Sequence, residues 1–269
     1  MDWQDEGPIF NLYQNICFIF RRLLRITLNW FMLMVTGKTK LERILIWKTN
    51  SRGRITAELE KLIDEGELPV MPKFWEAGQE DKLAIDIINK CCSKVDNEQF
   101  SEMKDVLKRS LSQIRGYREL RDHVERMCKE RYDRENEIHE KRVIISGHDP
   151  ATDFRGMGIL SLEQLIFLAQ YDVAHAQSIL SHSNHPLYGF PMAVTGINLT
   201  ALVRQLLQVN ALKMHFYNTI SGTPTIDNFH HVFCMFYEVK CSNYFVLFGL
   251  EENQKWSILI KLKMILKPN

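Results

Sequence analysis

The chain contains 269 residues, of which 45% are hydrophobic and 25% are charged, and this composition excludes a disordered or fibrous protein. Its 34 basic and 33 acidic residues leave a net charge of +1, so no overall positive field favours nucleic acid as a partner. The 6 cysteines lack the spacing of a disulfide framework, and the acidic amino terminus differs from a signal peptide, so we expect an intracellular, cytoplasmic protein.

Residues 1–37 form an apolar and basic amino-terminal segment, in which the first predicted element is a helix. Two uncharged runs, 7–20 and 26–37, are each shorter than the roughly 18 residues that a membrane-spanning helix needs. Three arginines between the runs share one side of a helix, which favours a helix lying at a membrane surface. A core helix whose arginines reach solvent is the alternative, and the sequence leaves both open. The residues expected at the membrane are Arg21, Arg22, Arg25, Trp30 and Phe31.

Residues 38–142 are rich in charge and predict the amino-terminal helices of a domain. Apolar residues recur there at steps of three and four, with charged residues on the opposite face, as amphipathic packing helices require. A coiled coil competes for the longest stripe, but Gly116 interrupts it and favours a helical bundle. The helices expected here cover residues 40–47, 55–63, 81–94 and 100–127.

Residues 143–240 carry few charges beyond position 150, so we expect them to form the buried centre of the domain. No alternating strand pattern of convincing length occurs before the tail, and the fold class expected is therefore all-α. Ser161 with Gln164 fits a capping box, and Thr225 after Pro224 fits a helix N-cap. The expected helices cover residues 161–170, 172–181, 192–208, 211–218 and 225–240.

The histidines of this centre are candidate metal ligands. His182 and His185 lie three residues apart, but no glutamate or cysteine stands beside them at ligand spacing. The adjacent His230 and His231 are expected on different sides of a helix. The phosphate-binding, dinucleotide-binding and common hydrolase motifs do not occur either. We therefore expect no metal site, no cofactor and no active site belonging to the chain itself.

Residues 150–160 contain an unusual arginine, Arg155, on a short loop that leads into an apolar helix. Gly156 and Gly158 allow the backbone to turn tightly or allow a partner to approach closely. Asp153 lies two residues before the arginine and is able to orient its guanidinium. From these residues alone, an Asp–Arg pair that only stabilises the loop is the favoured interpretation.

The pattern P-x-T-D-F-R-G-M-G-x-L-x-L-x-x-L at 150–165 resembles the signature of the ELMO domain family, specifically its single-domain ELMOD branch. Further similarities extend the resemblance over most of the chain, to about Tyr237. The fold that this resemblance implies is an all-helical ELMO-type domain, here preceded by the apolar and basic helix. The supporting segments are 36–38, 41–44, 114–117, 183–186, 196–200 and 222–225.

The resemblance implies a GTPase-activating protein for small GTPases of the Arf family or Arf-like kind in their GTP form. It places the essential arginine at Arg155, which would stabilise the charge that develops on the phosphate oxygens. The protein would thus regulate another protein's hydrolysis. The supporting residues of the motif are Thr152, Asp153, Phe154, Gly156 and Gly158.

Two departures from the family pattern leave other functions open. Residues 141–148 stand where relatives carry W-x-x-x-G-F-Q, and the tail at 241–269 diverges from the usual final helices. Both departures are typical of an alternative splice product or a mis-joined gene model. The alternative functions are a catalytically inactive binding module and a membrane-associated adaptor.

Overall fold

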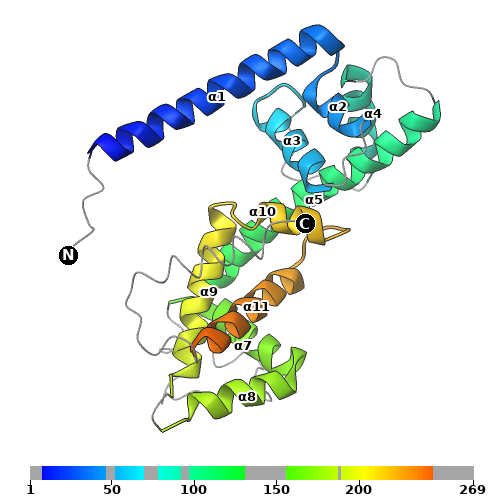
Figure 1. The fold of residues 1–269 in the computed structure, drawn as a ribbon. Coiled ribbons are helices and arrows are strands. Elements are labelled where there is room, and N and C mark those ends of the chain that lie inside the picture. The colour runs from blue at the N-terminus through cyan, green and yellow to red at the C-terminus, as the bar shows by residue number, and fades with distance from the viewer. Residues whose placement is uncertain are drawn as a thin grey trace. The chain divides into compact units, whose positions relative to one another are not determined.

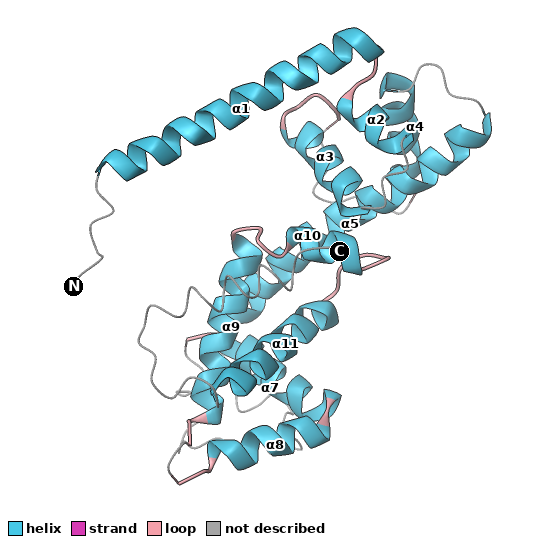
Figure 2. Ribbon diagram, in the orientation of Figure 1, coloured by secondary structure: helices cyan, strands magenta, loops and turns pink. Residues whose placement is uncertain are grey.

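The structure is a computed structural model that describes residues 8–46, 52–69, 78–91, 97–130, 156–186 and 189–244. All regular elements in these ranges are helices, and no strand occurs in them (Figures 1 and 2). The expected all-α class is confirmed. The chain divides into two compact units, Met1–Lys108 and Arg109–Asn269, and each is described by itself.

The first unit begins with a long helix, α1 (Pro8–Thr36), that ends at a glycine. Gly37 has φ +64°, and its N–H donates to the Leu33 carbonyl at 2.8 Å, so it closes the helix in the left-handed conformation that glycine adopts readily. Most of the described large apolar side chains of α1 from position 16 onward are exposed, from 42% at Leu33 to 65% at Met34, while Met32 is half-buried. A core helix would bury them, so the structure does not support that alternative. Within the described residues, no helix combines the length and hydropathy needed to cross a bilayer.

Three shorter helices and the first turns of a long one complete the first unit. Their inner faces bury aliphatic side chains, among which Leu41, Leu59, Ile87, Ile88 and Leu107 are 0% exposed. The apolar stripes predicted from periodicity thus form the core of this unit. The helices are α2 (Lys40–Ile46), α3 (Arg52–Asp64), α4 (Gln79–Cys91) and α5 (Asn97–Lys129), and α5 continues into the second unit.

Ion pairs connect these helices at their edges. Lys40 of α2 pairs with Glu58 of α3, while Asp81 of α4 accepts from Lys108 of α5 at 3.2 Å and lies 3.7 Å from Lys104. The two lysines lower the pKa of Asp81, chiefly through the hydrogen bond from Lys108. Because these side chains remain partly exposed, their contribution is small beside that of the buried core.

In the described part of the second unit, five helices pack with the remaining part of α5. The helices α7, α9 and α11 pack against one another, and α8 packs against α7 and α9 (Figure 1). The expected helix at 192–208 has the same bounds in the structure, while the others shift by up to a few residues. The helices are α7 (Gly158–Tyr171), α8 (Val173–Ser183), α9 (Met192–Gln208), α10 (Lys213–Thr219) and α11 (Ile226–Tyr244).

Aromatic side chains fill the centre of this unit. The Tyr117 ring of α5 meets Phe216 and Tyr217 of α10 edge to face, with ring centroids 5.9 and 6.0 Å apart. The Tyr117 hydroxyl donates to the Leu207 carbonyl at 2.9 Å, so its polar end is satisfied although the residue is buried. The Gln113 amide, one turn earlier on α5, donates to the Ile220 carbonyl at 2.6 Å. These contacts join α5 to the residues around α10.

The two cap predictions had different outcomes. Ser161 does not begin a helix: α7 starts at Gly158, and the buried Ser161 hydroxyl donates to the Gly158 carbonyl at 3.0 Å. Gln164 is likewise buried inside α7, so the predicted capping box is wrong. Thr225 directly precedes α11, where its N–H and hydroxyl both donate to Asn228 Oδ1 at 2.9 Å. The helix therefore starts where the sequence placed it.

Candidate functional site

The arginine motif is described only from its first glycine onward. Thr152, Asp153, Phe154 and Arg155 lie outside the described residues, as does the whole segment 131–155. The expected pairing of Asp153 with Arg155 therefore remains a prediction. The structure shows instead how the motif is attached to the fold, because Gly156 and Gly158 lead directly into α7.

Gly158 fixes the start of α7 against the carboxyl-terminal end of α5. Its φ is +56°, and a Cβ built there would lie 2.5 Å from the Glu130 oxygen and 2.7 Å from the Cys128 and Met127 oxygens. The N–H of the next residue, Ile159, donates to the same Glu130 carbonyl at 3.0 Å. Any side chain at position 158 would collide with backbone, so this residue has to be glycine. Arg155 is thus three residues from a fixed point.

The two glycines of the motif differ in their surroundings. Gly156 is exposed, and a Cβ built on it would meet nothing within 4 Å. The sequence suggested one role for both: a tight turn or the close approach of a partner. In the structure Gly158 serves internal packing, whereas only Gly156 leaves the open space that a partner would need.

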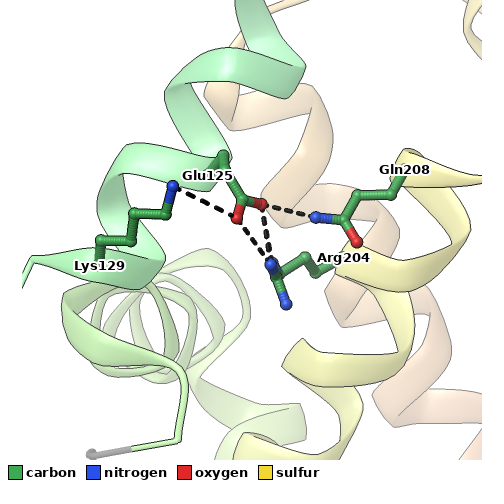
Figure 3. A network of polar contacts seen from close by, with 4 residues as sticks. All are labelled: Glu125, Lys129, Arg204 and Gln208. Carbon is green, nitrogen blue, oxygen red and sulfur yellow. Dashed lines mark hydrogen bonds and ion pairs between the residues drawn. The ribbon is translucent and has the colours of Figure 1, made fainter.

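A polar network holds the end of α5 that carries this attachment. The Arg204 guanidinium of α9 donates to Glu125 of α5, from Nη2 to Oε1 at 2.8 Å and from Nε to Oε2 at 3.1 Å (Figure 3). The Gln208 amide donates to Oε2 at 2.6 Å, and Lys129 Nζ lies 3.9 Å from Oε1. Hydrogen bonding by Arg204 is the main cause of the lowered pKa of Glu125. This bidentate geometry fixes α9 relative to α5.

Sequence reasoning missed this network. Glu125 and Arg204 are 79 positions apart, and no spacing rule connects them. The available signal was the scarcity of charge in the centre of the domain, where an isolated arginine such as Arg204 has to find a partner when it is partly buried.

Glu125→Gln is expected to lower the free energy of unfolding by about 1–2 kcal/mol, because Arg204 loses its carboxylate partner while the side-chain shape is kept. Urea unfolding of the full chain measures the change. The control is Glu119→Gln on the same helix, whose carboxylate is 61% exposed and 3.7 Å from Arg115 Nε. That change should cost at most about 0.5 kcal/mol. If both substitutions lower the free energy of unfolding equally, the α5–α9 network stabilises the protein no more than an exposed ion pair does.

The segments with family-like patterns contact one another in pairs. A Cβ built on Gly196 of α9 would lie 2.6 Å from Leu165 Cδ2, so α9 approaches α7 at the last leucine of the motif. A Cβ built on Gly116 of α5 would lie 2.1 Å from Thr223 Cγ2 and 3.0 Å from Pro224 Cδ. Each of these glycines therefore allows a second family-like segment to pack closely.

The adjacent histidines of α11 differ in exposure, since His230 is buried and His231 is half-buried, but they share one aromatic neighbour. The rings of His230 and His231 both lie against Phe167, with centroids 5.1 and 5.0 Å away. One wide aromatic ring thus reaches two neighbouring positions on the facing helix. Burial lowers the pKa of His230 to about 4, and the residue is only 5% exposed. In the described ranges, no group of three or more potential metal ligands comes together.

The free energy of unfolding is expected to decrease as the pH falls from about 6.5 toward about 4, because unfolded His230 takes up a proton that the folded state resists. The decrease from this residue amounts to at most about 3 kcal/mol. Urea unfolding at several pH values should show that the free energy of unfolding depends less steeply on pH in His230→Gln. Some pH dependence should remain because of His215, since burial also lowers the pKa of that residue. The exposed control His185→Gln should retain the slope, and an unchanged slope in His230→Gln would contradict the assignment.

The residues expected at a membrane lie along α1. Arg21 is exposed, Trp30 is 60% exposed and Phe31 is 56% exposed. Arg22 and Arg25 belong to the same continuous helix, but their side chains lie outside what the structure describes.

Comparison with known proteins gives one family. The model of the ELMO/CED-12 family matches residues 146–244, which include the motif and α7 to α11. No solved structure matches the chain at a significant level.

Three relatives show the extent of the similarity. ELMO domain-containing protein 2 of Homo sapiens is 33% identical over 243 residues, covering 81% of this chain and 82% of that protein. ELMO domain-containing protein 1 of Homo sapiens is 28% identical over 279 residues, covering 83% of this chain and 81% of that protein. ELMO domain-containing protein B of Dictyostelium discoideum is 42% identical over 89 residues, covering 33% and 30%. Since the similarity to protein 2 extends over most of both chains, and the family model matches the residues that carry the motif, this chain belongs to the ELMO/CED-12 family.

Proposed function

We propose that this protein accelerates GTP hydrolysis by a small GTPase of the Arf family or Arf-like kind, with Arg155 acting in trans. The supporting observation is the motif at 150–165, which resembles the signature of the ELMOD branch and lies in a chain of that family. Its attachment at Gly158 adds a physical argument. The backbone is fixed at Gly158, three residues after the arginine that would enter a partner's site.

The chemistry proposed needs one positively charged planar group. As the bond to the γ-phosphate breaks, negative charge builds on the phosphate oxygens, and a guanidinium stabilises it by two parallel hydrogen bonds. Asp153 would orient Arg155, and Thr152 would cap the turn that follows. The open surroundings of Gly156 would admit the partner's backbone next to the arginine.

Single-turnover GTP hydrolysis by a panel of Arf and Arf-like proteins, with and without the full chain, tests the proposal. A cognate GTPase should hydrolyse its GTP faster by a factor on the order of 10³–10⁵, the range known for arginine supplied by an activator. The panel is needed because specificity arises from surface residues spread over several helices.

The same measurement, combined with a binding assay, separates the alternative functions. A GTPase that binds the chain in its GTP form without faster hydrolysis would identify an inactive binding module. Absence of both binding and stimulation across the panel would contradict the proposed partner class. The replacement of the W-x-x-x-G-F-Q segment by residues 141–148 is the sequence feature that makes this comparison necessary.

A further inference from the structure

The amino-terminal helix α1 has a charge and exposure pattern that the proposed function does not use. We propose that α1 lies in the plane of a negatively charged lipid surface, with its apolar side in the acyl-chain boundary and its arginines among the headgroups. This inference does not depend on GTPase activation, because it rests on residues outside the family pattern at 146–244.

Two adjacent rows of exposed apolar residues follow α1 from Ile19 to Val35. Ile19, Leu23, Ile26, Trp30 and Met34 are separated by steps of three and four residues, which keeps them on one side of an α-helix. Their exposed fractions are 54%, 55%, 55%, 60% and 65%. Large apolar side chains in a continuous row are expected to be covered in a stable soluble protein. Something outside the described fold therefore has to cover them.

The second row widens this apolar side. Phe20, Leu24, Leu28, Phe31 and Val35 follow the same helical spacing next to the first row, and their exposed fractions lie between 56% and 65%. A two-stranded coiled coil buries only a narrow seam of two positions per heptad. The broader apolar side of α1 is typical of helices that lie in a membrane interface.

Polar positions predominate on the opposite side of α1, which they share with the positions of Phe18 and Leu33. Asn11, Asn15, Arg22, Arg25 and Asn29 are separated by four, seven, three and four residues, so these positions share one side of the continuous helix. The stripe runs along most of the helix. An apolar side and a polar side of similar length are what an interfacial orientation requires.

The charge of α1 indicates which surface would bind it. The helix Pro8–Thr36 contains three arginines and no aspartate or glutamate. Anionic lipids attract each such arginine by about 1 kcal/mol near the surface. A second copy of α1 would bring three more arginines and no acidic group, so charge complementarity favours a lipid surface over self-association. A spanning orientation would place the arginines in hydrocarbon, and α1 lacks the hydropathy for it.

Co-sedimentation of the full-length protein with lipid vesicles tests the proposal. Vesicles of phosphatidylcholine mixed with phosphatidylserine should pellet the protein about ten- to a hundredfold more effectively than phosphatidylcholine alone. Arg21→Gln should weaken pelleting on the mixed vesicles about fivefold and leave that on the neutral ones unchanged. Equal binding to both kinds of vesicle, or to neither, would overturn the proposal.

Two methionines on opposite sides of α1 allow a test of which side of the helix faces the acyl chains. Met34 lies in the first apolar row and is 65% exposed, whereas Met32 lies seven residues after Arg25, on the arginine side. Met34→Gln should weaken binding to mixed vesicles about tenfold, because it places an amide in the acyl-chain boundary. Met32→Gln should change it by less than about twofold. Equal losses would contradict the proposed orientation.

Sedimentation velocity without vesicles tests the alternative that a second copy of the chain covers the apolar side of α1. The lipid proposal predicts that the wild-type chain and Met34→Gln have the same oligomeric state in solution. A wild-type oligomer that Met34→Gln converts to monomer, together with no vesicle binding, would show that a second copy covers the apolar side. Thermal melting of each variant checks that the substitutions at exposed Met34 and half-buried Met32 leave the fold unchanged.

Discussion

Arg155→Lys is expected to reduce stimulation of GTP hydrolysis by a factor on the order of 10³ or more, with binding of the GTPase retained. Lysine keeps the positive charge but lacks the planar fork that matches two phosphate oxygens, so the exchange removes the interaction made in the transition state. The rate of single-turnover hydrolysis and the affinity for the GTP-bound partner should therefore separate. The first should fall, and the second should change little.

Arg54→Lys is the matched control for this measurement. Arg54 is an exposed arginine of α3, in the first unit of the chain, and its replacement changes the same functional group without touching the motif. It should retain full stimulation. Stimulation that survives in Arg155→Lys would exclude the arginine mechanism, and equal loss of binding and hydrolysis would identify Arg155 as a docking residue only.

Gly158→Ala is expected to lower the free energy of unfolding by about 2–4 kcal/mol. Alanine at φ +56° costs roughly 1–2 kcal/mol in the left-handed region, and its Cβ would approach three backbone oxygens to 2.5–2.7 Å. Relieving such overlap by moving α5 from α7 adds about 1–3 kcal/mol. Urea unfolding measures the difference, with one common dependence of the free energy on urea concentration fitted to the wild type and Gly158→Ala.

Gly156→Ala provides the control for the first glycine of the same motif. Its backbone requires no positive φ, and an added Cβ would meet nothing within 4 Å, so the stability change should stay within about 0.5 kcal/mol. If both substitutions destabilise the protein equally, the close packing of Gly158 on α5 does not exist. If neither does, α7 begins in another conformation.

The helices were predictable because they depend on local spacing. Apolar residues at steps of three and four fixed the position of α5 and α9, and Leu107, Leu111 and Ile114 of the predicted stripe are 0% exposed. The start of α7 was misplaced because Ser161 resembles a cap in sequence. Its true start depends on Gly158 meeting the end of α5, a contact between segments that no local pattern records.

The sequence proposes Arg155 as the candidate site residue, which stays a prediction, but it does not reveal the contacts that surround the motif. The resemblance to the ELMO domain family identifies Arg155 as the candidate residue. Without it, the residues of the 150–160 loop favour an Asp153–Arg155 ion pair that only stabilises the loop. The support behind the motif was invisible, because Glu125 and Arg204 meet only after the helices have packed. The resemblance also could not show that Gly196 contacts Leu165, or that Gly116 contacts Thr223. Such partners are set by tertiary packing, which the order of residues along the chain does not reveal.

The attachment of α5 to the residues around α10 has a consequence for the order of folding. Gln113 donates to Ile220, 107 positions later, and Tyr117 donates to Leu207, 90 positions later. Closing loops of this length costs entropy before any contact is gained, and such long-range contacts slow folding. During synthesis the apolar stripe of α5 therefore leaves the ribosome long before its partners do. The nascent chain passes through a stage at which it needs protection from aggregation.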